Sequence, residues 1–348
     1  MKAKNLLIAG LVVVGLLVGG TAVVAAMSLN GAGASFPYPL YSQWAYKYNQ
    51  LTGDQINYQS IGSGGGIAQI KAKTVDFAGS DAPLEKPELD ASGLIQFPMV
   101  VGGVVPAINV PGIKAGQFKL TPDALANIYL GKITRWNDAA LKAINPGLAL
   151  PDLALTVVFR SDGSGTTWIY TNYLSKVSTE WRQRVGAGKS VSWPTGVGGK
   201  GNEGVAAFVQ KTKGAIGYVE FAYAVENKMT YAALRNQAGA FVEPTSETFQ
   251  AAAANADWPN APGFYMVLTD QPGAGSWPIT GATFILTYRQ QPDANKAAAM
   301  LKYFDWCYHH GADVARKLNY VPMPENVIKL VQARWAAEIR AGGRRVWP

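Results

Sequence analysis

The chain has 348 residues, of which 48% are hydrophobic and 16% charged, and its formal net charge is +8. This length is enough for about two domains with well-filled cores, and the composition excludes a disordered or collagen-like chain. The basic residues are scattered apart from Arg344-Arg345, so we expect no nucleic-acid binding, and the diffuse positive charge favours small anions.

The first 26 residues have the pattern of a secretory signal peptide. Lys2 and Lys4 precede an apolar stretch that ends in Ala25-Ala26, and the next charge is Lys47. We expect cleavage near Ala26. An uncleaved anchor is the alternative, because residues 6–26 could just span a bilayer.

Helical and strand patterns alternate over the next part of the chain, which is typical of an α/β protein. In order, they predict a helix over 40–51 that stops at Gly53, a strand over 56–58, a glycine-rich turn over 60–66, a helix that starts at Ile67 and a strand over 75–77.

Two later apolar runs define the expected domain organisation. Residues 97–109 lack helical spacing and predict a strand buried on both faces. A second run near 277–288 predicts another crossing strand. Two such strands would form a hinge between two α/β lobes, with a cleft that closes on a ligand. The expected lobes are residues 27–104 with 281–348, and residues 105–280.

The remaining predicted elements lie on either side of these runs. They are a helix from Thr121-Pro122 to Gly131, strands over 155–159, 215–219 and 283–286, and two late helices around Phe304 and Val331.

Four polar turns come at strand ends or helix starts and carry the functional signal. They are residues 33–36, 62–65, 80–81 and 160–166. Helix N-termini have unpaired N–H groups and a partial positive charge, so they hold anions readily. Each turn alone also has a structural interpretation, as an N-cap, a turn aspartate or an ion pair. Together they predict an anion site at a sheet edge.

Several motifs that look functional lack part of the required pattern. Residues 196–201 lack the Gly-Lys-Ser/Thr ending of a P-loop, so we expect a flexible loop there. Gly163-Ser164-Gly165 is no nucleophile elbow, and the only histidines, His309 and His310, are adjacent at a predicted helix end. We therefore expect no catalytic residue and no metal site. Cys307, the single cysteine, has apolar neighbours at helical spacing and is expected to be buried.

The sequence resembles the periplasmic phosphate-binding proteins of ABC-type phosphate uptake. The resemblance runs from Gly31 to at least Trp306, and it is carried by "GAGASFPYPLYSQWAYKY", "INYQSIGSGGGIAQI", "VDFAGSDAPL", "YLGKITRWND", "RSDGSGTT", "WPTGVGGKGNEGV" and "GAIGYVE". It implies a two-lobed type II periplasmic-binding-protein fold with a two-strand hinge and phosphate in the cleft. It also implies a periplasmic, monomeric protein that works with permease subunits and needs no cofactor.

The resemblance also assigns the ligand contacts. The implied phosphate-binding residues are Ser35, Phe36, Ser63, Asp81, Arg160, Asp162, Ser164, Gly165 and Thr166. Ser35 stands where the family often has threonine, so the hydroxyl is kept and a methyl is lost.

The carboxylates distinguish phosphate from other tetrahedral anions, because protonated phosphate can donate a hydrogen bond and sulfate cannot. We expect Asp81 to be the main proton-accepting selector. Asp162 is expected to orient Arg160, with ligand contact as a further option. Two alternatives are a binding protein for sulfate or molybdate, and a secreted phosphatase or hydrolase that uses Ser63 or Ser164, although no general base accompanies either serine.

Overall fold

The computed structural model describes residues 26–348. The predicted signal peptide lies outside the described residues except for Ala26. Within the described range, none of the helices combines the length and the apolar character that crossing a membrane requires.

Helices and strands alternate along most of the chain. The helices are α1 (Tyr38–Thr52), α2 (Ser63–Lys71), α3 (Lys86–Ser92), α4 (Pro122–Tyr129), α5 (Ala139–Ile144), α6 (Gly165–Val177), α7 (Thr179–Arg184), α8 (Gly201–Lys211), α9 (Phe221–Glu226), α10 (Ser246–Ala253), α11 (Ala294–His310), α12 (Ala312–Lys317) and α13 (Glu325–Glu338), with the 3-10 turns η1 (Trp258–Asn260) and η2 (Pro262–Phe264). The strands are β1 (Ser28–Gly33), β2 (Gln55–Ser60), β3 (Phe77–Ser80), β4 (Leu94–Ile108), β5 (Lys119–Leu120), β6 (Thr156–Arg160), β7 (Val197–Gly199), β8 (Ala215–Glu220), β9 (Thr230–Tyr231), β10 (Ala233–Arg235), β11 (Phe241–Val242), β12 (Thr280–Tyr288), β13 (Gln290–Gln291), β14 (Val321–Pro322), β15 (Arg340–Ala341) and β16 (Arg344–Arg345).

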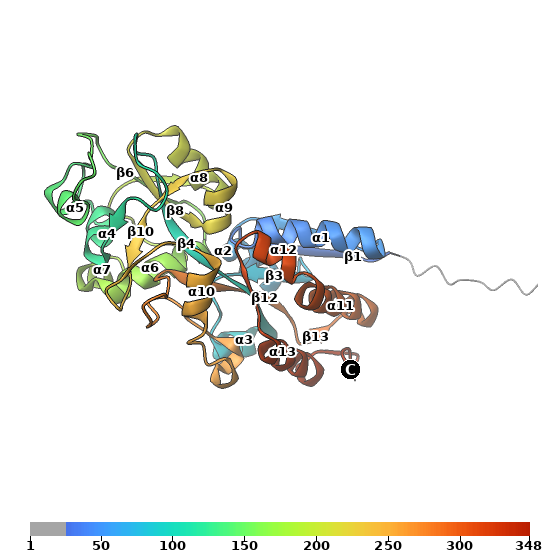
Figure 1. Ribbon diagram of the computed structural model, residues 1–348. Coiled ribbons are helices and arrows are strands. Elements are labelled where there is room, and N and C mark those ends of the chain that lie inside the picture. Colours follow the sequence, from blue (N-terminus) through green and yellow to red (C-terminus); the bar gives the residue numbers. More distant parts are fainter. Residues whose placement is uncertain (1–25) are drawn as a thin grey trace, which may run out of the picture.

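The main sheet path runs β2-β1-β3-β12-β4-β8-β6-β7, and β4 joins its two halves. Residues 94–103 of β4 pair antiparallel with β12, whereas residues 104–108 pair antiparallel with β8. We call the half built on β2, β1, β3 and β12 the first lobe, and the half built on β8, β6 and β7 the second lobe. In Figure 1 the green and yellow middle of the chain forms the second lobe, while the blue start and the brown end pack together in the first.

The long strand β4 confirms the predicted buried run, since all fifteen of its residues are buried. Two glycines stand where it passes between the lobes. A Cβ on Gly102 would lie 2.9 Å from the Phe36 ring, and one on Gly103 would lie 2.1 Å from the Phe249 ring. The glycines therefore let aromatic rings from both sides pack directly on the crossing strand.

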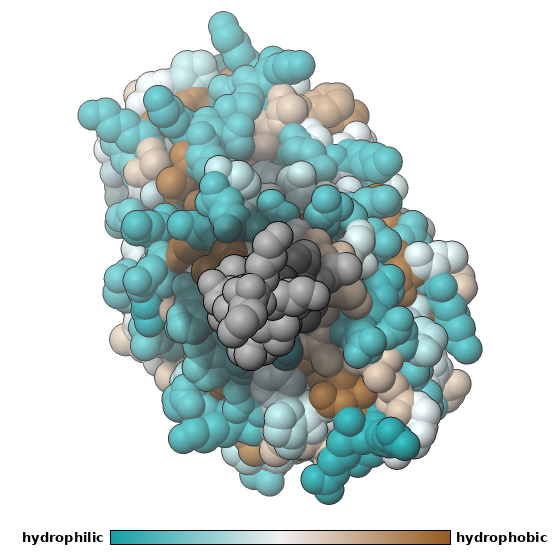
Figure 2. Space-filling view, turned by 90° about the vertical axis from the view of Figure 1, so that its right-hand side faces the viewer, coloured by the Kyte–Doolittle hydropathy of each residue, from teal (hydrophilic) through white to brown (hydrophobic). Residues whose placement is uncertain are grey.

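Aromatic side chains fill both lobes, within one continuous buried cluster. In the first lobe, Phe304 packs edge-on against Phe77 at a centroid distance of 5.2 Å and against Phe97 at 5.5 Å. In the second lobe, Tyr170 stacks on Tyr218 at 4.3 Å. The face of the first lobe turned toward the viewer in Figure 2 is mostly hydrophilic with small scattered apolar patches. Most of the large apolar side chains of both lobes are buried.

Most predicted elements are confirmed, including α4 with its Thr121 cap and the burial of Cys307. Two predictions are wrong. Helix α2 begins at Ser63 rather than at Ile67, because three glycines form its first turn. The segment 196–201 is not a flexible loop, since β7 pairs parallel with β6 and α8 begins at Gly201.

Candidate functional site

The predicted site residues lie where the two lobes meet, and nearly all of them are buried. Ser35, Phe36, Ser63, Asp81, Arg160, Ser164 and Thr166 are each at most 3% exposed. The side chain of Asp162 is 13% exposed. The lobes touch directly at this point: Gly64 N–H donates to the Gly163 carbonyl oxygen at 2.8 Å. The site is therefore enclosed between the lobes in this structure.

Asp81 and Ser63 come from the first lobe, at the end of β3 and the start of α2. The Ser63 hydroxyl donates to Asp81 Oδ2 at 3.5 Å and accepts from Asp81 N–H at 3.2 Å. Neither Asp81 Oδ1 nor the nearby Thr283 hydroxyl makes a hydrogen bond to a described residue. Burial raises the pKa of Asp81 from 3.8 to about 7, against the opposing effects of nearby Thr283, the Arg160 charge and the Ser63 hydroxyl. Asp81 thus presents a buried acceptor that lacks a partner.

Arg160 ends β6 in the second lobe and is gripped by Asp162. Its Nε donates to Asp162 Oδ1 at 2.8 Å, and a terminal nitrogen donates to Oδ2 at 2.5 Å. Burial pushes the pKa of Asp162 up, but the hydrogen bonds and charge of Arg160, with a bond from Gly201 N–H, more than offset this and hold it below its ordinary value. This bidentate pair fixes the plane of the guanidinium.

Helix α6 begins at the site with three of the predicted contacts. Ser164 is its N-cap, and the Ser164 hydroxyl oxygen accepts from Thr167 N–H at 3.0 Å. Gly165 N–H donates across the lobe interface to Ser63 Oγ at 3.0 Å. A Cβ on Gly165 would lie 2.4 Å from Ser63 Oγ and 2.6 Å from Asp81 Oδ2, so only glycine permits this approach. The α2 and α6 N-termini converge here, which favours an anion.

Ser35 and Phe36 follow β1 and differ in what they contribute. The Ser35 hydroxyl oxygen accepts from both the backbone and the side-chain amide of Asn202. The Phe36 ring is fully buried, 6.2 Å from the Tyr320 ring, and its carbonyl oxygen accepts from the Tyr320 hydroxyl. The ring therefore belongs to the core, and a ligand contact from Phe36 would have to use its backbone N–H.

The sequence reasoning missed two residues that support the site. Asn202 in α8 bonds to Ser35 and Thr166. Tyr218 in β8 accepts from Arg160 N–H at 3.1 Å and shares a 2.7 Å hydrogen bond with Thr167. The sequence does contain a pattern that could have identified Asn202: it is a small polar residue directly after Gly201 at a helix start. The four polar turns were found by the same pattern.

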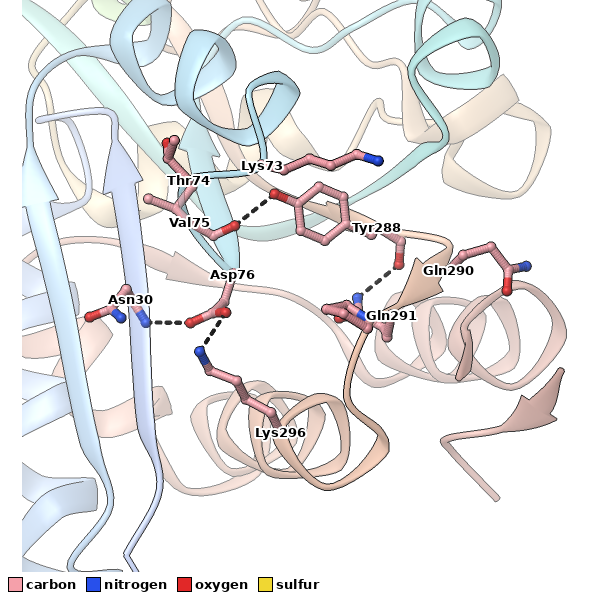
Figure 3. Close-up of a pocket in the computed structure, with 10 residues that line it drawn as sticks. Asn30, Lys73, Thr74, Val75, Asp76, Tyr288, Gln290, Gln291 and Lys296 are labelled. Carbon is pink, nitrogen blue, oxygen red and sulfur yellow. Dashed lines mark hydrogen bonds and ion pairs between the residues drawn. The ribbon is translucent and has the colours of Figure 1, made fainter. Parts of the chain in front are cut away.

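A pocket of about 590 Å³ lies elsewhere, at the far end of the first lobe. Figure 3 shows Asp76 between Asn30 N–H and the Lys296 ammonium, with Gln290 and Gln291 nearby. The carboxylate is already paired there, and none of the predicted site residues lines the pocket. Among residues 26–348, no cluster of three or more His, Cys, Asp or Glu side chains has the arrangement of a metal site.

Solved structures of low sequence identity share the fold. A high-affinity periplasmic phosphate-binding protein with phosphate bound matches with a TM-score of 0.70 at 22% identity, covering 92% of this chain and 98% of the other. A phosphate-binding protein from Stenotrophomonas maltophilia matches with a TM-score of 0.66 at 20% identity, covering 89% and 94%. These matches confirm the predicted two-lobed type II fold.

Sequence comparisons give the family. The PBP superfamily domain matches residues 20–309. The phosphate-binding protein PstS of Xylella fastidiosa (strain Temecula1) is 57% identical over 314 residues, which cover 90% of this chain and 86% of the relative. That of Pasteurella multocida is 54% identical over 323 residues, covering 92% and 94%. The chain therefore belongs to the PBP superfamily and, within it, to the family of the phosphate-binding proteins PstS.

Proposed function

We propose that the protein binds inorganic phosphate between its lobes and delivers it to the permease of an ABC-type phosphate transporter. One observation carries the proposal: Asp81 offers a buried oxygen without a donor partner, in a site otherwise formed by hydroxyl, amide and guanidinium donors. The names of the relatives and of the two solved structures point to the same ligand.

The proposed contacts combine both lobes. They are Ser35, Phe36 through its N–H, Ser63, Asp81, Arg160, Asp162, Ser164, Gly165 and Thr166. The first lobe supplies the carboxylate, and the second supplies the positive charge of Arg160 and the α6 N-terminus. A tetrahedral anion held between them would stabilise the closed arrangement of the lobes, because it contacts both.

Selectivity follows from the proton count of the ligand. Phosphate at neutral pH keeps at least one proton, which can be donated to Asp81 Oδ1. Sulfate and molybdate bring no proton, so their oxygens would face the Asp81 carboxylate, and an unsatisfied buried polar contact costs about 1–3 kcal/mol or more when charged. This argument favours phosphate over the other oxyanions.

We also propose the setting in which the protein works. It is a monomeric, non-enzymatic protein of the periplasm that needs no cofactor. Its lobes comprise residues 27–104 with 281–348, and residues 105–280; the change of β4 from β12 to β8 between Gly103 and Val104 supports the first of these boundaries.

Titration calorimetry on residues 27–348 tests the proposal. We expect tight phosphate binding that a large excess of sulfate or molybdate does not displace, and no release of phosphate from a phosphoester. Tight sulfate or molybdate binding would favour the alternative oxyanion, and turnover of the ester would favour the hydrolase.

A further inference from the structure

The hydrogen bonds that a hydroxyl oxygen already accepts decide whether that hydroxyl can donate to, or accept from, a ligand. A hydroxyl has two acceptor lone pairs and one O–H to donate. Ser35 Oγ accepts from Asn202 N–H at 3.1 Å and from Asn202 Nδ2 at 2.9 Å. With both lone pairs used, the Ser35 hydroxyl has only its O–H left for a further partner.

The oxygen of the Thr166 hydroxyl likewise accepts two hydrogen bonds. Its Oγ1 accepts from Asn202 Nδ2 at 3.1 Å and, over a longer 3.4 Å, from the Arg160 guanidinium. The Thr166 O–H is therefore also free to donate. The two protons of one Asn202 amide thus reach one hydroxyl in each lobe.

The orientation of the Asn202 amide is fixed independently of these hydroxyls. Asn202 is fully buried, and its Oδ1 accepts from Glu220 N–H at 2.9 Å. A backbone N–H can only donate, so the oxygen of the amide must face Glu220 and the NH₂ must face Ser35 and Thr166. The start of α8 is itself held, because Gly201 N–H donates to Asp162 Oδ1 at 3.0 Å.

Ser63 also has both lone pairs occupied, but by other donors. Its Oγ accepts from Asp81 N–H and Gly165 N–H, at 3.2 and 3.0 Å. Both donors are backbone groups, and the Ser63 O–H points to Asp81 Oδ2 at 3.5 Å, so Asn202 has no part in the direction of this hydroxyl. Ser35 and Thr166, in contrast, depend on Asn202.

We infer that Asn202 is a positioning residue that fixes the Ser35 and Thr166 hydroxyls as hydrogen-bond donors to the bound anion. This inference rests on the proposed phosphate function. Asn202 thus makes Ser35 and Thr166 donors and leaves Asp81 Oδ1 to accept a ligand proton. It also couples the lobes, since its bonds to Ser35 cross between them.

The test compares two Asn202 variants by phosphate calorimetry. Asn202→Ala leaves the hydroxyls free to turn, and we expect phosphate binding about tenfold weaker. Asn202→Asp keeps the shape but accepts from both hydroxyls and withdraws their protons from the ligand, with an expected loss of about a hundredfold or more. Asn145→Ala is the matched control: Asn145 is 4% exposed and bonds to Lys119 and Leu141 away from the site. It should leave phosphate affinity unchanged.

A double-mutant cycle separates positioning from a structural role. In a chain that already carries Ser35→Ala and Thr166→Val, Asn202→Ala has no hydroxyl left to direct, and we expect less than about a twofold further loss. An equal tenfold loss in that background would overturn the inference, as would wild-type affinity in both Asn202 variants. Failure of both variants to fold while Asn145→Ala folds would also overturn it. Absence of phosphate binding by the unmutated chain would instead refute the proposed function.

Discussion

Two aspartates follow strand ends in opposite lobes, at the same site, and have opposite environments. Asp162, after β6, is held by Arg160 through two hydrogen bonds, and its pKa lies below its ordinary value. Asp81, after β3, has one oxygen without a donor, and burial raises its pKa to about 7. The residue type is the same, so the hydrogen-bond partners make the difference: one carboxylate grips a guanidinium, and the other keeps an oxygen to which no described residue donates.

Replacing Arg160, the partner of Asp162, should have the largest effect on phosphate affinity. In Arg160→Met the cationic donor is lost and a buried carboxylate is left unpaired, so we expect phosphate binding about a thousandfold weaker or worse by calorimetry. Arg135→Met is the control, because Arg135 pairs with Asp152 on the exposed surface of the same lobe. Retained affinity in Arg160→Met would remove Arg160 from the site.

The pH dependence of stability should have opposite signs for the two carboxylates. The folded pKa of Asp81 lies above its ordinary 3.8, so its stabilising contribution is present below that value and is lost as the pH rises through about 7, by at most about 4 kcal/mol. The contribution of Asp162 is present above its ordinary pKa and is lost as the pH falls through its lowered value.

Urea unfolding without phosphate between pH 4 and 8 measures the Asp81 effect. The free energy of unfolding of the wild type, minus that of Asp81→Asn, should decline across this range. An unchanged difference would mean that Asp81 does not titrate as its burial requires.

Asp81→Asn also tests the selector role directly. An amide can donate to a bare oxygen, so sulfate should become acceptable, and the preference for phosphate over sulfate should fall about a hundredfold. Competition calorimetry with both anions gives this ratio. Asp76→Asn, in the pocket of Figure 3, is the matched control and should leave the ratio unchanged. An intact preference in Asp81→Asn would refute the assignment.

The smallest effect is expected from Asp162→Asn. An amide keeps one acceptor for Arg160 but loses the bidentate carboxylate grip, so phosphate affinity should fall about tenfold while the phosphate-to-sulfate ratio stays constant. The same competition measurement checks both quantities. If the ratio changes as it does in Asp81→Asn, both aspartates select the ligand and the contrast between them disappears.

Local patterns in the sequence predicted the elements whose causes are local. The Thr121-Pro122 start of α4 depends on capping and the fixed φ of proline, and the burial of β4 follows from its own apolar run. The placement of Arg160 beside Asp162 was predictable for the same reason, since residues two apart on an extended chain point the same way.

Contacts between distant segments were not predictable in this way. The start of α2 at Ser63 depends on a close approach that only glycine allows: at Gly62, the N-cap, φ is +82° and a Cβ would lie 2.7 Å from the Gly163 carbonyl oxygen in the other lobe. The strand β7 exists because β6 lies beside it. Asn202 gains its role only when α8 brings it to Ser35, 167 residues earlier in the chain. The two residues of each such contact lie too far apart in the chain for a local sequence pattern to include both.

The enclosure of the site also has a kinetic consequence. An anion behind residues that are at most 3% exposed leaves only after the lobes separate, which breaks the bonds from Gly64 to Gly163, from Asn202 to Ser35 and from Tyr223 to the Ser35 carbonyl. The dissociation rate is then limited by the rate of opening. A partner that holds the lobes apart would release the anion without competing for any of its contacts.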